Sequence, residues 1–168
     1  AEYLKITIIH AKKEKTFYAM QDGLIDLGDE SEIRLPFTVH SGRIEDLIQI
    51  FGTLVKKISW FPTTLKGEVH GTVNVHGKTK FSDMIIDSSL EGVDWNLFGE
   101  RARKVKMNLG YDQGTYFARE VVLSKTSGSI KGMIEFDSKK NNLDWSFATE
   151  GFSLNDLDFF ERLEIPAR

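Results

Sequence analysis

Apolar and polar residues alternate strictly along residues 63–81. The odd positions carry Leu, Val, Thr, Phe or Gly, whereas every even position is polar or charged. Because successive side chains of a strand point to opposite faces, this pattern predicts a long strand with one apolar and one polar face. Gly67, Gly71 and Gly77 fall on the apolar face. They fit a sheet that bends around an apolar ligand, or equally the twist and bulge positions of an ordinary β-sandwich.

The same alternation recurs along most of the chain and predicts further strands, each with one solvated face. These segments are residues 3–9, 33–39, 105–111, 117–123, 130–136 and 143–147. The turns between them are short and rich in Gly, Asp, Asn and Ser, as expected for hairpins between antiparallel neighbours. No strand–helix–strand alternation supports a parallel α/β sheet. We therefore predict an all-β fold built on an antiparallel meander.

Two segments have helical rather than strand periodicity. Residues 41–55 and 153–163 place apolar side chains three and four positions apart, and each begins with a serine that can act as an N-cap. The sequences Ile44-Glu45-Asp46-Leu47 and Leu154-Asn155-Asp156-Leu157 align with each other. We therefore expect two short amphipathic helices at equivalent points of an approximate repeat of strands followed by a helix.

Composition narrows the class of protein. The chain has 168 residues, enough for a single domain, and its net charge of -3 provides no basic field for nucleic acid. It lacks cysteine, so disulfides and thiol chemistry are excluded. The sequence contains no run of apolar residues long enough for a membrane span, and it opens directly into a strand. We expect residues 1–168 to be one segment from inside a longer protein.

Residues that could carry catalysis or bind metal are few and scattered. His70 and His76 share a strand face but are separated by roughly 20 Å, too far apart to share a metal ion. Carboxylates cluster around residues 22–32, at positions predicted to lie in turns or in solvent, which indicates a solvated acidic rim. We therefore expect no enzyme activity, no metal and no cofactor.

The order of motifs along the chain resembles that of the AsmA-like and TamB family of Gram-negative envelope proteins. The resemblance covers residues 41–163, whereas the first 40 residues match no phrase of the family. It rests on the amphipathic helix at residues 41–55 followed by the segments Leu65–Val73, Leu90–Trp95, Tyr111–Phe117, Ser127–Ile134 and Phe152–Leu157.

This resemblance implies a long, curved antiparallel sheet folded into an open trough (a β-taco) that is apolar inside and polar outside. It also implies a parent protein that is anchored in the inner membrane, spans the periplasm and carries phospholipid between the inner and outer membranes. An older proposal for the family is assistance to outer-membrane protein assembly. Acyl chains would then lie in a groove lined by Val69, Val73, Val75, Phe81, Leu109, Phe117, Leu123, Ile134, Phe136, Trp145 and Phe147.

Two other interpretations remain open at the level of sequence. The chain length also permits a closed, lipocalin-like barrel around a small apolar ligand, although two interposed helices and the lack of a Gly-x-Trp phrase in the first strand argue against it. Alternatively, the apolar face is the core of a β-sandwich, and the protein is a scaffold or assembly module that binds partners at exposed strand edges.

Overall fold

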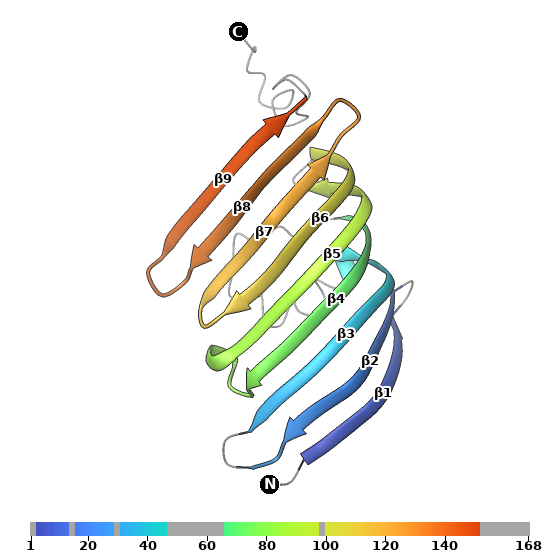
Figure 1. Cartoon of the computed structure of the whole chain (residues 1–168), viewed down its shortest axis with the longest axis vertical. Coiled ribbons are helices and arrows are strands. Elements are labelled where there is room, and N and C mark those ends of the chain that lie inside the picture. The colour runs from blue at the N-terminus through green and yellow to red at the C-terminus, as the bar shows by residue number, and fades with distance from the viewer. Residues whose placement is uncertain (1–2, 14–15, 29–30, 47–65, 98–99, 152–168) are drawn as a thin grey trace.

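A computed structural model describes residues 3–13, 16–28, 31–46, 66–97 and 100–151 of the chain. Nine strands form one sheet in which each strand pairs antiparallel with its neighbours in sequence, so that the spatial order runs from β1 to β9 (Figure 1). A short 3₁₀ turn, η1 (Phe81–Asp83), precedes the fifth strand. The strands are β1 (Tyr3–Lys13), β2 (Thr16–Asp26), β3 (Glu32–Arg43), β4 (Lys66–Lys78), β5 (Met84–Leu97), β6 (Glu100–Asp112), β7 (Thr115–Ser124), β8 (Ser129–Asp137) and β9 (Asn142–Glu150).

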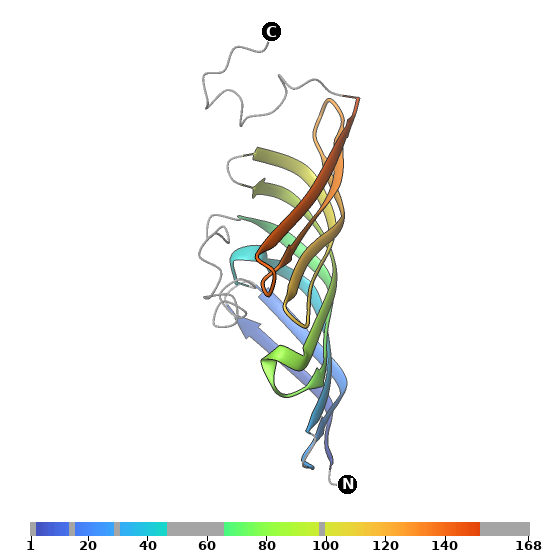
Figure 2. The ribbon, with the colours of Figure 1, turned by 90° about the vertical axis from the view of Figure 1, so that its left-hand side faces the viewer.

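The sheet is open, and its strands form a single twisted layer when viewed from the side (Figure 2). The predicted all-β antiparallel meander is therefore confirmed, whereas a trough-shaped β-taco is not. A lipocalin-like barrel would require β1 to pair with β9, and a sandwich would require a second sheet. Among the described strands, β1 does not pair with β9, and all nine strands belong to one sheet.

The helices expected from the sequence are only partly within the described residues. Residues 44–46 are helical, but β3 continues through Arg43, so Ser41 lies in a strand rather than at a helix N-cap. The remainder of the first expected helix, and all of residues 153–163, lie outside the described residues. Thr16 ties the helical residues to β2, because its buried hydroxyl donates a hydrogen bond of 2.5 Å to the buried carboxylate of Asp46.

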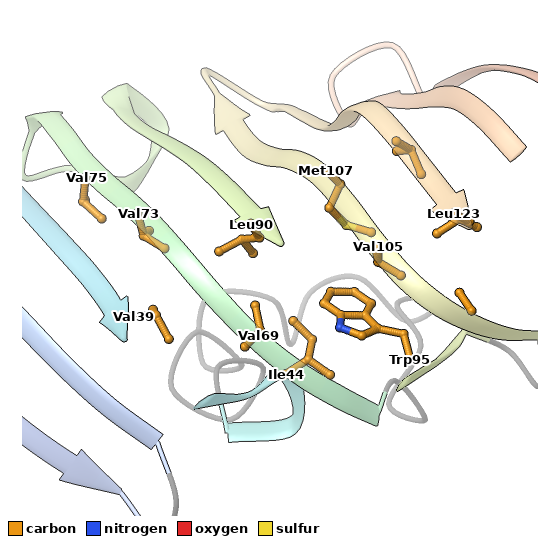
Figure 3. Packing of buried hydrophobic residues seen from close by; sticks show 12 residues of the cluster. Val39, Ile44, Val69, Val73, Val75, Leu90, Trp95, Val105, Met107 and Leu123 are labelled. Carbon is orange, nitrogen blue, oxygen red and sulfur yellow. The ribbon is translucent and has the colours of Figure 1, made fainter. Parts of the chain in front are cut away.

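One face of the sheet, here called the apolar face, holds the hydrophobic core. Buried side chains from β3 to β7 gather there, joined by Ile44 from the helical residues (Figure 3). Strand register explains the gathering, because Val69 of β4 lies opposite Gly92 of β5, which in turn lies opposite Val105 of β6. The buried cluster comprises Val39, Ile44, Val69, Val73, Val75, Leu90, Trp95, Ala102, Val105, Met107, Val121 and Leu123.

Trp95 is the largest fully buried side chain of this cluster, with 1% of its surface exposed. Its indole Nε1–H donates a hydrogen bond of 2.6 Å to the carbonyl oxygen of Glu68. The ring lies against Gly67 and Gly92, where an added Cβ would come within 2.4 Å and 2.2 Å of it. These two glycines therefore make room for a side chain of this same protein rather than for a ligand.

Gly71 has a different role, set by its backbone. Its φ of +143° is rarely adopted by residues with a side chain, and an added Cβ would lie 2.0 Å from the carbonyl oxygen of Ser89. The glycine therefore permits close approach of β4 and β5. The interpretation that glycines leave the apolar face open for a ligand is thus not supported at Gly67 or Gly71.

The opposite face of the sheet, here called the polar face, carries rows of charged side chains on neighbouring strands. His76 and Asp87 approach to 3.0 Å across β4 and β5, and Lys106 and Glu91 approach to 3.3 Å across β5 and β6. Such exposed pairs each contribute at most about 1 kcal/mol. These pairs show that the polar face carries charged side chains, whereas the buried cluster lies on the apolar face.

Candidate functional site: the exposed end of the apolar face

The apolar face continues beyond the buried cluster as a row of aromatic residues across β6, β7 and β8. Tyr111, Tyr116 and Phe136 are successive cross-strand partners. The ring centroids are 4.9 Å apart between Tyr111 and Tyr116 and 6.5 Å apart between Tyr116 and Phe136. Burial raises the pKa of both tyrosine hydroxyls above the ordinary value. The row joins the core to the last two strands by an uninterrupted apolar surface.

At the C-terminal end of the sheet, the apolar residues on this face are exposed. In β9, Leu143 is 52% exposed, Trp145 66% and Phe147 43%. They lie directly opposite Phe136, Ile134 and Gly132 of β8. We call this surface the end patch and define it as Ile134, Phe136, Leu143, Trp145 and Phe147.

The end patch is ordered by contacts within itself. The rings of Trp145 and Phe147 are tilted with centroids 6.0 Å apart. Phe147 also covers Gly132, where an added Cβ would lie 2.2 Å from the Phe147 ring. An aromatic ring that covers a glycine on the neighbouring strand stabilises strand register. The patch is therefore an apolar surface with internal packing contacts, and its β9 side chains are exposed to solvent.

The structure divides the residues predicted to line a groove into groups. Val69, Val73, Val75 and Leu123 are buried in the central cluster, where no more than 9% of any of them is exposed. Leu109, Ile134 and Phe136 are half-buried on the same face. Only Trp145 and Phe147 are freely exposed there. The side chain of Phe81 lies outside the described residues.

Phe117 was expected on the apolar face but lies on the polar face. It is the cross-strand partner of Gly110, next to Leu109, and its ring lies 4.2 Å from the guanidinium carbon of Arg119. The cause is a bulge in β7, where Glu120 has a φ of +49° and the register shifts. Before the bulge Tyr116 and Ala118 face the core, whereas after it Val121 and Leu123 do.

Sequence reasoning also missed several residues of the apolar face. Trp95 follows Asp94, whose φ of +54° marks an irregularity in β5, and simple alternation from Leu90 would place Trp95 on the polar face. Leu90 of β5 was not assigned to a face either, whereas Val105 and Met107 lie on the same face as Leu109, as the alternation over residues 105–111 predicts.

The polar face is hollowed in two places. One hollow, of about 460 Å³, lies over β2 and β3 and includes Asp22, Arg34 and His40. Of the predicted acidic rim, Asp22 and Glu32 are exposed, while Asp29 and Glu30 lie outside the described residues. Within the described ranges, no group of three or more His, Asp or Glu is arranged to hold a metal ion. No helix in that part of the chain has the length and apolarity to cross a membrane.

Comparisons with known proteins identify no relative. No family model matches the chain, no curated protein matches it, and no solved structure matches it.

Proposed function

We propose that this chain is a lipid-binding segment of a longer protein that carries phospholipid between the inner and outer membranes, and that the end patch contacts the acyl chains. The observation that carries the proposal is the exposure of Leu143, Trp145 and Phe147 on the same face of the sheet as the buried central cluster. The proposal extends the resemblance to the AsmA-like and TamB family. It places the chain in the periplasm, within a parent anchored in the inner membrane, and gives it no enzymatic role.

The physical argument concerns apolar area and its shape. Burying one methylene group is worth about 0.8 kcal/mol, so a few methylenes laid on Trp145 and Phe147 are held without any specific polar contact. An apolar surface without charged groups recognises apolar chains and does not discriminate between headgroups. We therefore expect binding across phospholipids of different headgroup, with the headgroup in water.

The patch also lies where a ligand can reach it. The buried residues Val69 and Val73 are already covered, whereas the surface over β8 and β9 is accessible. Acyl chains are therefore expected to contact Trp145 and Phe147 first. Contact with the central residues would require the chain's own atoms to move aside.

The test is site-specific photocrosslinking combined with native mass spectrometry of protein purified from bacteria. A photoreactive residue replaces Trp145 in one variant and Ser146 in the matched control, since these neighbours lie on opposite faces of β9. We expect covalent phospholipid adducts at position 145 and few or none at position 146.

A second variant sharpens the result. Trp145→Ser combined with Leu143→Ser should lower the amount of co-purified phospholipid several-fold while leaving the circular dichroism spectrum unchanged, because both side chains are more exposed than buried. Equal crosslinking at positions 145 and 146, or lipid-free protein throughout, would overturn the proposal.

A further inference from the structure

The two outer strands of the sheet differ in how they are protected against pairing with another strand. The strand β1 carries an exposed lysine, Lys5, and lysine on an edge discourages unwanted strand addition. The nine residues of β9 include no Lys, Arg or Pro, and β9 pairs with β8 without any register shift. Among the described strands, none pairs with the outer edge of β9. Within the described part of the chain, this edge is therefore regular, unpaired and free of the Lys, Arg and Pro residues that discourage strand addition.

A charge on β9 also lacks an oppositely charged neighbour. Asp144 lies on the polar face directly opposite Glu135 of β8, so two carboxylates meet across the strands. Glu135 is paired with Arg119 of β7. Asp144 accepts a hydrogen bond of 2.7 Å from the side-chain amide of Asn142, and no cationic side chain among the described residues forms an ion pair with it. A basic residue on a strand added at the outer side of β9 would give Asp144 an oppositely charged partner.

A second copy of this chain does not supply that residue. Two copies could join into one larger sheet with both apolar faces on the same side. In that arrangement, antiparallel pairing at this edge requires β9 of one copy to pair with β9 of the other, and β9 has no basic residue. Pairing β9 with the lysine-containing β1 of another copy would instead be parallel, because β1 and β9 run in the same direction in this meander. The charge pattern therefore favours a strand of another sequence over a second copy of this chain.

We propose that the outer edge of β9 binds an extended polypeptide strand that runs antiparallel to it. The strand has apolar side chains opposite Leu143, Trp145 and Phe147 and a Lys or Arg opposite Asp144. Backbone hydrogen bonds would hold the added strand, and its alternating side chains would select it. The proposal does not require lipid binding, because its evidence is the unpaired edge of β9 and the charge of Asp144, although the added strand would lie beside the end patch.

The experiment uses the full chain and two labelled nine-residue peptides. The first, Lys-Val-Thr-Val-Thr-Val-Lys-Val-Thr, places its second lysine opposite Asp144 when it pairs antiparallel with β9 from Glu150 to Asn142. The second peptide carries Glu in place of that lysine. Fluorescence anisotropy measures binding, and hydrogen exchange measures protection of the β9 amides.

We expect the lysine peptide to bind about two- to fivefold more tightly than the glutamate peptide, in line with the energies of cross-strand charge pairs. The variant Asp144→Lys, at an exposed position, should reverse this order. Protection should rise in β9 and remain unchanged in β1. Equal binding of both peptides, or no protection of β9, would overturn the proposal. So would a dimer in analytical ultracentrifugation with protected β9 amides and no peptide, which would make a second copy the occupant.

Discussion

The centre and the C-terminal end of the sheet share one sequence pattern but differ in exposure. In β4, Val69 and Val73 are at most 4% exposed, whereas in β9 Trp145 is 66% exposed and Leu143 52%. Both strands alternate apolar and polar residues, and both place their apolar residues on the same face. The centre thus forms a hydrophobic core, while the end presents the same kind of surface to solvent. Alternation identifies which face is apolar, but not what covers it.

Glutamate substitutions in the two regions give the largest expected contrast. Val73→Glu places an unpaired charge in the core and should cost on the order of 3–5 kcal/mol of unfolding free energy. Trp145→Glu, at an exposed position, should change it by less than about 1 kcal/mol. Urea denaturation followed by circular dichroism measures both. Similar losses for the two variants would show that the end is packed as tightly as the centre.

Gly71→Ala tests the backbone of the centre. The φ of +143° alone should cost about 1–3 kcal/mol with a side chain present, and the contact with the Ser89 carbonyl should add to this loss. Gly151→Ala is the control, because Gly151 also has a positive φ, of +79°, but its added Cβ would meet nothing closer than 3.4 Å. A larger loss from the control than from Gly71→Ala would contradict the close approach of β4 and β5.

Trp95→Phe tests the hydrogen bond of the buried indole while keeping most of the ring. Losing the donor leaves the carbonyl of Glu68 without this partner, which should cost about 1–3 kcal/mol. At the end of the sheet, Trp145→Phe should have almost no effect on thermal unfolding, because that side chain is exposed. Equal changes in melting temperature would show that the two tryptophans are equivalent.

The smallest expected effect concerns the turn between β8 and β9. The carboxylate of Asp137 accepts hydrogen bonds from the backbone N–H groups of Lys140 and Lys139, and these bonds lower its pKa. The pKa of Asp137 is therefore lower in the folded state than in the unfolded state, where it is about 3.9, so the ionised carboxylate stabilises the fold above that pH. This stabilisation is lost as the pH falls through the folded-state pKa. Amide exchange in the turn should therefore rise in strong acid.

The variant Asp137→Asn isolates this titration. Asparagine keeps an oxygen acceptor for the same two N–H groups but does not titrate in this range. The acid-dependent part of the exchange should therefore disappear from the variant. If the variant keeps the same pH dependence as the natural sequence, another group controls the turn.

The sequence was sufficient to predict seven of the nine strands and their antiparallel order, whereas β2 and β5, each with an irregular residue of positive φ (Asp22 and Asp94), were not predicted. Strict alternation in residues 63–81 identified β4, and short turns such as Tyr111-Asp112-Gln113-Gly114 identified antiparallel hairpins. The exposure of the end patch could not be predicted in this way. Leu143 and Val69 each occupy an apolar position of an alternating strand, and only the packing of the whole chain distinguishes them.

Irregular residues account for the errors about faces. Asp94 and Glu120 have φ near +50° within strands, and each disturbs the alternation of the residues around it. Neither residue is a glycine, so neither gives a clear sequence signal of a bulge. The result was one wrong face, for Phe117, and one missed core residue, Trp95.

The order of the strands has a consequence for how the chain folds. Each strand pairs only with those next to it in sequence, and apart from the connection between β3 and β4 the described links are short. Closing such short loops costs little entropy, so a hairpin can form and then serve as the template for the next strand. The sheet can therefore assemble progressively from one end while the rest of the chain is still being synthesised or transported.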